Sequence, residues 1–416
     1  MKSKLILLAA ITGLFPGLAQ NWEQLNIPES PSRYDDVFFL NENLGWAADG
    51  AGSAVYKTTD GGNTWTQQSY NNGEYLRNIE FLNEDIGFLG ALSETLYRTT
   101  DGGETWEIVW DLQGAIPAIC GLDTVGDSTV YGCGAYFEPA YVIKSTDSGE
   151  TWEVINMSAY ANSLVEILFV DEQLGYVSGG SNSGGVILKT TDGGQSWTEI
   201  YNSGRPGEQV WKMQILYSNP NVMFGAVQSF DPFNGKLIKS VNNGQNWQEF
   251  EVPDPFIQGV GFITENHGWM GGHNSGFLET TDGGQTWNDT GFGWSLNRFQ
   301  IFNQNLVYCS GHSIYKYTDN LSVSDIDTQR PEDMAIIVAP NPVEDVLNIS
   351  VDYQRSDHMV ITLFDESGKL IQQLLRETID SKGKRTYQFA FPQKPGIYYL
   401  LFHYDLGYQS KKIIKK

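Results

Sequence analysis

Beyond residue 20 the chain is a succession of short apolar segments separated by polar turns that are rich in glycine. Val37-Phe38-Phe39, Ile79-Glu80-Phe81 and Val260-Gly261-Phe262 are representative, and six residues after each last phenylalanine stand Gly45, Gly87 and Gly268. Short apolar runs bounded by turn residues predict β-strands. With 45 Gly, 12 Trp, 21 Tyr and 21 Phe and few helix-forming runs, the sequence predicts an all-β fold.

One eight-residue box returns along the chain. It occurs at Thr58–Trp65, Thr99–Trp106, Ser145–Trp152, Thr190–Trp197 and Thr280–Trp287, with Asn242 replacing the aspartate in Ser240–Trp247 and a remnant at Tyr317–Asn320. The Asp or Asn positions of these copies are 37 to 50 residues apart. That period is the length of a propeller blade of four strands. Six boxes and a remnant predict a seven-bladed β-propeller.

The seventh unit lacks its tryptophan and its outer strand. A matching segment stands at the other end, where Asn21-Trp22-Glu23-Gln24 resembles Asn246-Trp247-Gln248-Glu249. We therefore expect the N-terminal strand to pair into the last blade and close the ring, which removes two exposed sheet edges.

The box is predicted to form the turn between the third and fourth strands of a blade. Glycine supplies positive φ, aspartate accepts hydrogen bonds from the turn, and tryptophan buries its ring between blades. These structural roles fall to Asp60, Asp101, Asp147, Asp192 and Asp282, and to Trp65, Trp106, Trp152, Trp197, Trp247 and Trp287.

This pattern resembles the Asp-box (BNR) repeat of sialidases, sortilin-type receptors and xyloglucanases. The Phe-x6-Gly-aromatic part more closely resembles the Ycf48-like photosystem II assembly factors. The resemblance covers about residues 21–321. It implies the propeller fold and a box that lies away from the active face, and it implies no particular chemistry.

The distribution of charge predicts two domains, and the N-terminal segment predicts export from the cytoplasm. Residues 21–330 carry 39 acidic and 13 basic side chains, whereas residues 331–416 carry 11 of each, so two domains are expected. The overall charge of −24 argues against nucleic-acid binding.

Residues 1–19, with Lys2, Lys4 and the apolar run Leu5–Leu14, predict a cleaved secretory signal that is too short to span a membrane. The propeller is expected over 20–321, with no transmembrane segment in the mature chain.

A linker at 322–334 precedes a second domain at 335–416. Its short alternating strands predict a small Ig-like β-sandwich. Pro340-Asn341-Pro342, Gly368-Lys369, Gly396-Ile397-Tyr398-Tyr399 and the basic end Lys411–Lys416 resemble the type A sorting domain of the type IX secretion system. The resemblance implies recognition by that machinery, passage through the periplasm, and release or attachment at the surface of a Gram-negative bacterium. An ordinary adhesion sandwich is the alternative.

Cysteine and histidine positions give no metal or cofactor prediction. Cys120 and Cys133 flank Gly126-Asp127, so they either form a disulfide across a hairpin or remain buried thiols, as Cys309 would. No zinc spacing is present. His273, His312 and Asp49 lie in matching turns and would bind a metal only if those turns fold inward.

Aromatic residues outside the repeat fall largely on one face of the predicted propeller. They are Tyr70, Trp110, Tyr160, Tyr201 and Trp294 in blade connections, and Tyr136, Phe137, Phe230 and Phe233 in turns between second and third strands. Such rings either form a binding surface or cap the blade ends.

The inner strands supply candidate charged residues. Counting back four positions from Phe39, Phe81 and Phe302 gives Asp35, Arg77 and Arg298, and the same count from Ile215 gives Trp211. We expect these four and Trp294 to form a site for an anion or carboxylate where the channel opens. Arg77 and Arg298 resemble part of an arginine patch in the photosystem assembly factors. The alternative is an Asp35–arginine pair that joins adjacent blades.

No catalytic residues are predicted. A sialidase-like Arg-Ile-Pro motif and a Gly-x-Ser-x-Gly elbow are absent from the sequence, while the 39 acidic residues leave a two-carboxylate glycosidase open. The sequence therefore predicts a non-enzymatic, secreted or surface propeller that binds a protein or a glycan. A secreted glycoside hydrolase of the Asp-box type is the alternative.

Overall fold

The computed structural model describes residues 21–68, 73–137, 139–319, 334–353, 357–365, 370–379, 381–392, 394–404 and 407–416. It divides into two compact units between residues 320 and 321. The expected signal at 1–19, most of the expected linker, Tyr70 and Gly368-Lys369 lie outside the described residues.

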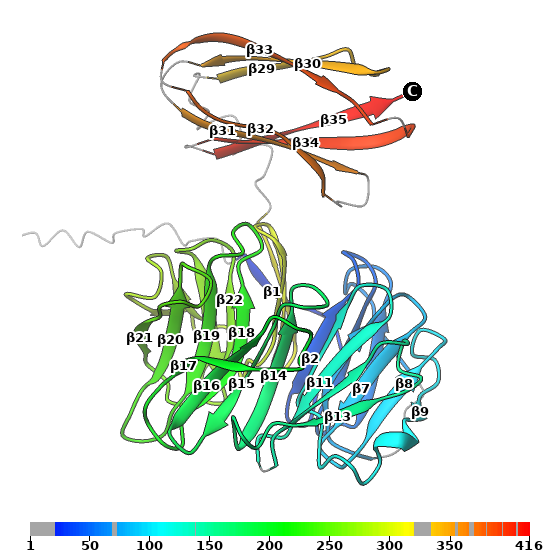
Figure 1. Ribbon diagram of the computed structural model, residues 1–416, viewed down its shortest axis with the longest axis vertical. Helices are drawn as coiled ribbons and strands as arrows, with labels where there is room; N and C mark the ends of the chain where they lie inside the picture. Colours follow the sequence, from blue (N-terminus) through cyan, green and yellow to red (C-terminus); the bar gives the residue numbers. More distant parts are fainter. Residues whose placement is uncertain are drawn as a thin grey trace, which may run out of the picture. The chain divides into compact units, whose positions relative to one another are not determined.

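The described part of the first unit forms seven four-stranded antiparallel sheets, which we number as blades in chain order (Figure 1). Blade 1 is β2 (Tyr34–Phe39), β3 (Gly45–Asp49), β4 (Ala54–Thr58) and β5 (Thr66–Gln67). Blade 2 is β6 (Leu76–Phe81), β7 (Gly87–Ala91), β8 (Leu96–Thr99) and β9 (Glu107–Ile108). Blade 3 is β10 (Gly121–Val125), β11 (Thr129–Gly134), β12 (Tyr141–Ser145) and β13 (Glu153–Asn156), after a short 3₁₀ turn at Trp110–Leu112. Blade 4 is β14 (Ser163–Phe169), β15 (Gly175–Ser181), β16 (Gly184–Thr190) and β17 (Thr198–Asn202).

Blade 5 is β18 (Gln209–Ile215), β19 (Met223–Gln228), β20 (Gly235–Ser240) and β21 (Gln248–Val252). Blade 6 is β22 (Ile257–Phe262), β23 (Gly268–Gly272), β24 (Leu278–Thr280) and β25 (Asn288–Asp289). Blade 7 is β26 (Phe299–Asn303), β27 (Leu306–Ser310) and β28 (Ile314–Thr318), completed by β1 (Trp22–Gln24) from the other end of the unit.

The sheets form a closed ring. Each innermost strand contacts the innermost strand of the next blade, and β26 of blade 7 contacts β2 of blade 1. Strand β1 pairs antiparallel with β28, with Trp22 opposite Tyr317. The all-β prediction is confirmed, and the N-terminal strand closes the ring as the sequence match indicated. Among the described residues, no helix reaches the length and apolarity that crossing a membrane requires.

Each box forms a self-contained turn. In the first copy, Gly61 and Gly62 have φ of 70° and 88°, the Gly62 N–H donates to Thr58 Oγ1 (3.0 Å), and the Thr64 N–H donates to Asp60 Oδ1 (2.9 Å). The same hydrogen bonds recur in the later copies. The hydroxyl and N–H four residues further on lower the pKa of Asp147, Asp192 and Asp282 to about 2. These carboxylates accept hydrogen bonds from their own turns and stabilise them.

Seven of the eight apolar clusters among the described residues of the ring contain a box tryptophan or its replacement in blade 7. The box residues Trp65, Trp106, Trp152, Trp197, Trp247 and Trp287 account for six clusters. Trp22 belongs to the seventh, where its ring centroid lies 4.2 Å from that of Phe277 and 5.2 Å from that of Trp269. The N-terminal strand thus supplies the tryptophan that blade 7 lacks.

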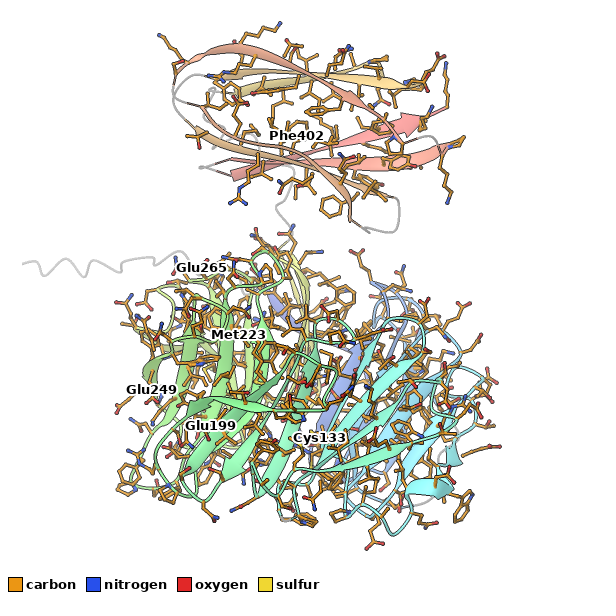
Figure 2. The ribbon with its side chains drawn as sticks, viewed as in Figure 1. Cys133, Glu199, Met223, Glu249, Glu265 and Phe402 are labelled. Atoms are coloured by element: carbon orange, nitrogen blue, oxygen red, sulfur yellow. The ribbon has the colours of Figure 1, made fainter. Side chains whose placement is uncertain are left out.

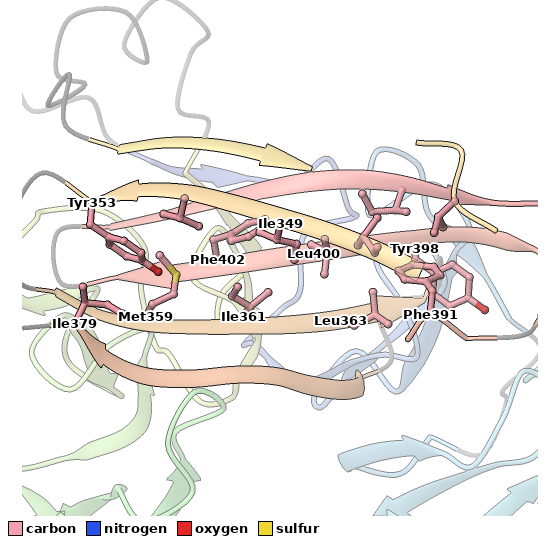
Figure 3. Packing of buried hydrophobic residues seen from close by; sticks show 14 residues of the cluster. Ile349, Tyr353, Met359, Ile361, Leu363, Ile379, Phe391, Tyr398, Leu400 and Phe402 are labelled. Atoms are coloured by element: carbon pink, nitrogen blue, oxygen red, sulfur yellow. The ribbon is translucent and has the colours of Figure 1, made fainter. Parts of the chain in front are cut away.

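The second unit is a two-sheet sandwich. One sheet holds β29 (Met334–Ala339), β30 (Val346–Tyr353) and β33 (Gly383–Ala390), and the other holds β31 (Asp357–Asp365), β32 (Leu370–Ile379), β34 (Gly396–Tyr404) and β35 (Gly407–Lys415). Figure 3 shows the shared core, in which Ile349 from one sheet lies among Ile361, Leu400 and Phe402 from the other. Whether this sandwich is Ig-like in connectivity stays a prediction.

The cysteines are buried free thiols. Cys120 and Cys133 are neighbours in blade 3, where the Cys120 N–H donates to the Cys133 carbonyl (2.8 Å; Cys133 is marked in Figure 2). Of the two alternatives left open by the sequence, Cys120 and Cys133 are therefore buried thiols and do not form a disulfide.

We expect Trp22→Ala to destabilise the propeller by about 3–5 kcal/mol, because it empties a well-packed aromatic site at the ring closure. Deletion of residues 21–26 should cost at least as much. Chemical denaturation measures both. Trp110→Ala is the matched control, since the Trp110 side chain is 70% exposed and its loss should be nearly neutral. Equal stability of the Trp22 variant and this control would contradict the closure role.

Candidate functional site

A register irregularity recurs in the innermost strands. In blades 1, 2, 4, 5 and 6 the pairing with the second strand skips one residue near the start of the strand. The skipped residues are Asp35, Arg77, Val165, Trp211 and Gln258. Such a β-bulge re-aims side chains. The Arg77 guanidinium of blade 2 lies 5.4 Å from the Trp211 ring of blade 5, so these residues reach across the channel.

Four side chains, which we call the mouth cluster, meet there: Arg33, Asp35, Arg77 and Trp211. Arg77 Nη1 is paired with Asp35 Oδ1, and Arg33 Nη2 lies 2.8 Å from the same oxygen. Arg33 Nη1 also donates to Gln258 Oε1 (2.7 Å). All four side chains are buried. The sequence count correctly brought Asp35, Arg77 and Trp211 together, and it missed Arg33, which lies two residues before Asp35.

Two donors of the mouth cluster have no hydrogen-bond partner among the described residues. They are Arg77 Nη2 and Trp211 Nε1. A buried donor without an acceptor costs free energy, so such atoms mark either a ligand position or a place for water.

Arg298 does not join the mouth cluster, which corrects the sequence prediction. In blade 7 the skipped residue is Phe302, and Ile301 pairs with Val307 as Phe39 pairs with Gly45. Counting four residues back from Ile301 gives Asn297, whose side chain donates to the Asp35 carbonyl (2.5 Å). Arg298 therefore corresponds to Asp36, one position further along the strand. The shifted bulge makes a count from Phe302 wrong by one residue.

Arg298 lies in a second group, the channel cluster, with Asp36, Glu80, Asp123, Glu166 and Lys212. Arg298 Nη1 and Lys212 Nζ both pair with Glu166. Arg298 Nε is 3.3 Å from Asp36 Oδ1, and its Nη2 is 3.8 Å from Glu80 Oε2. The cluster joins strands of blades 1, 2, 3, 4, 5 and 7. Sequence reasoning missed it, although the position after the bulge yields Asp36, Glu166 and Lys212 in three of the five bulged blades.

Four carboxyl groups face only two cations in this cluster. Burial raises the pKa of Asp36, raises that of Glu80 well above its usual range, and raises that of Asp123 to about 7. Hydrogen bonding from the Phe169 N–H and the charge of Arg298 oppose the rise at Asp123. The raised pKa values of Glu80 and Asp123 favour their neutral forms, which reduces the excess of negative charge in the cluster.

Exposed aromatic side chains occur on the turns between the second and third strands of blades 3 and 5, and those of blade 3 lie beside the mouth cluster. Tyr136, Phe137, Phe230 and Phe233 are each partly exposed. The Tyr136 ring lies 6.3 Å from Trp211, and its carbonyl accepts from Gln209 Nε2 (3.3 Å). Tyr201 is buried instead and donates to Glu249. Trp294 is exposed in the connection between blades 6 and 7, where it lines a separate pocket.

His273 and His312, which could bind a metal only if their turns fold inward, are engaged within the fold. His312 Nδ1 lies 2.9 Å from the Ser32 carbonyl, and burial together with Arg33 and Arg77 lowers the pKa of His273 to about 4. In the part of the chain that the structure describes, no group of three or more His, Cys, Asp or Glu side chains is arranged for a metal ion.

Two sequence families match the chain. Residues 17–124 and 234–306 match the photosynthesis system II assembly factor YCF48, and residues 338–416 match the secretion system C-terminal sorting domain. No curated protein matches the sequence in a direct search. The sorting domain implies secretion and a secreted or outer-surface location.

Solved propellers are similar in fold. A structure of YCF48 bound to D1 peptide is 17% identical, covers 72% of this chain and 98% of its own, and has a TM-score of 0.57. PorZ, a surface component of the type IX system of Porphyromonas gingivalis, is 14% identical, with 92% and 59% coverage and a TM-score of 0.52. A GH74 xyloglucanase from Xanthomonas campestris is 13% identical, with 80% and 59% coverage and a TM-score of 0.46. At these identities the matches to YCF48 and PorZ show the propeller fold alone.

Arg298→Met should lower the free energy of unfolding by about 3–5 kcal/mol, because it leaves the buried carboxylates of Asp36 and Glu166 without the Arg298 guanidinium as a partner. Arg98→Met is the matched control, since Arg98 pairs with Glu150, whose side chain is 65% exposed, and should cost about 1 kcal/mol or less. Denaturant titration at pH 7 compares the two variants. A neutral Arg298 variant would show that the channel cluster does not hold the blades together.

Asp123→Asn should flatten part of the pH dependence of stability. Because the folded-state pKa of Asp123 is raised from 3.8 to about 7, its protonated form stabilises the fold, and this contribution is lost as the pH rises from about 4 to 7. The variant stays neutral and keeps an oxygen for the Phe169 N–H. We expect its stability relative to the wild type to increase between pH 4.5 and 7.5, by about 1.4 kcal/mol for each unit of pKa shift removed. A constant difference over this range would contradict the assignment.

Proposed function

We propose that this protein is a non-enzymatic binding propeller, exported by the type IX system of a Gram-negative bacterium through the periplasm. Its ligand is a protein segment whose carboxylate docks at the mouth cluster. The observation that carries the proposal is the pair of unpartnered buried donors, Arg77 Nη2 and Trp211 Nε1.

The mouth cluster suits a carboxylate. Two guanidinium groups share the single charge of Asp35, which leaves the cluster one positive charge in excess within a propeller rich in acids. Arg77 is held through Nη1, so its free Nη2 is fixed in position. A carboxylate would accept from Nη2 and from the indole N–H of Trp211 without displacing Asp35. Because both donors are shielded, binding requires a side-chain movement, and the partly exposed Tyr136 ring beside Trp211 is suited to it.

The neighbouring rings suit a peptide. Tyr136, beside Trp211, and Phe137, in contact with Tyr136, offer apolar contact area to the residues that precede a terminal carboxylate. The similar propeller solved in complex with a D1 peptide supports a peptide as the class of ligand. A catalytic pair is less favoured, because the clustered carboxyl groups of the channel are buried and engaged with cations.

The test uses an array of peptides with free C-terminal carboxylates and the same peptides as C-terminal amides. We expect the full chain to bind a subset of the acids, and to bind their amides at least tenfold more weakly. Arg77→Lys keeps the pair with Asp35 and loses the free donor, and Trp211→Phe keeps a ring and loses the N–H. Each should weaken binding about tenfold and change the free energy of unfolding by about 1 kcal/mol or less.

Trp106→Phe is the matched control, because Trp106 Nε1 is also buried without a partner but lies in the core between blades. It should leave binding unchanged. A glycan panel scored for binding and for released product covers the other candidates. Glycan binding without peptide binding, or product release, would overturn the proposal in favour of a glycan receptor or a glycoside hydrolase.

A further inference from the structure

A pocket of about 600 Å³ opens where blades 5 and 6 meet the connection to blade 7. Its walls are the connection Pro253–Phe256, the turn Asn274–Gly276 and the segment that runs from Asp289 to Trp294. None of its lining residues belongs to the mouth cluster. It is therefore a separate site candidate.

The backbone holds Trp294 outward. The side chain is 51% exposed, and no contact with another aromatic ring occurs among the described residues. Its neighbours Gly293 and Ser295 have φ of 70° and 55°, a conformation that is strained for serine. The Trp294 carbonyl accepts from the His312 N–H (2.9 Å), and the Ser295 N–H donates to the Ser275 carbonyl (3.1 Å). Strained backbone that presents an exposed indole is typical of a ligand position.

The walls of the pocket are acidic. Asp231, Asp254 and Asp289 line it, and no lysine, arginine or histidine does. Asp254 is 4% exposed and accepts from Ser275 Oγ (2.6 Å) and from the Phe256 N–H (2.9 Å), so its carboxylate is fixed. Asp231 and Asp289 are exposed at the rim. These charges repel an anionic ligand and attract a cation.

We infer that this pocket binds an organic cation, with its ammonium or guanidinium group over the face of Trp294 and close to the rim carboxylates. The indole is the side chain with the strongest attraction for cations, and Phe256 adds a second ring to the wall. Lysine and arginine side chains and free quaternary amines share this chemistry. The inference does not depend on the carboxylate site at the mouth.

The experiment measures binding to the full chain by ligand-observed NMR and calorimetry. The probes are Nα-acetyl-lysine amide, Nα-acetyl-arginine amide and choline, with Nα-acetyl-norleucine amide as the uncharged match and cellotetraose as a sugar. We expect at least one cation to bind with a Kd in the millimolar range or tighter, and its affinity to fall as salt increases. Preference among the three cations distinguishes a peptide side chain from a free amine.

Trp294→Ala should weaken the binding of that cation at least fivefold, and Asp231→Asn with Asp289→Asn should weaken it by a similar factor. Trp110→Ala, which removes another exposed tryptophan, should leave it unchanged. Thermal melting confirms that each variant is folded. The inference is overturned if norleucine amide binds as well as the cations, if only cellotetraose depends on Trp294, or if no cation binds.

Discussion

Ring closure by the N-terminal strand is the constraint on which the propeller depends. Each blade buries the apolar face of its sheet only against the next blade, so an unclosed array would expose two faces and two strand edges. Pairing of β1 with β28 removes both edges at once, and Trp22 fills the cluster that blade 7 cannot complete. This pairing joins the first and last strands of the propeller. Each blade in the closed ring therefore packs between two neighbouring blades.

The box face is fixed by a second recurring contact. Lys57, Lys144 and Lys316 on the third strands of blades 1, 3 and 7 each donate to a glycine carbonyl in the box of the following blade, at 3.0, 2.9 and 3.0 Å. The box aspartates are meanwhile occupied by their own turns. These box aspartates and lysines are therefore engaged within the fold. Both candidate sites lie elsewhere, in the channel and on the opposite loops, where side chains are free of the repeat.

The sequence was most informative where the structure is periodic. The box, the outer tryptophans and the closing strand recur with fixed chemistry, so spacing alone located them. Arg298 was misplaced because its position depends on which residue of β26 pairs with Val307, and a bulge moved to Phe302 leaves no trace in the order of side chains. The channel cluster joins strands of six blades, so only the closed ring brings its carboxyl groups and cations together. The pocket at Trp294 depends on left-handed backbone at Ser295, which residue type does not predict.

The two candidate sites have opposite charge within one acidic propeller, and the fold explains how. At the mouth, bulges on adjacent strands bring Asp35 and Arg77 together and Arg33 pairs with the same carboxylate, so a local positive excess exists although residues 21–330 carry a net charge of −26. At the Trp294 pocket, the lining contains aspartates and no basic residue, so the pocket is negatively charged like the propeller as a whole. The charged residues of the inner strands pair with one another in the buried channel cluster. The loops are not part of this network, so their residues can be either acidic or basic. A ligand with both a carboxylate and a cationic side chain would gain from both sites if its length spanned them.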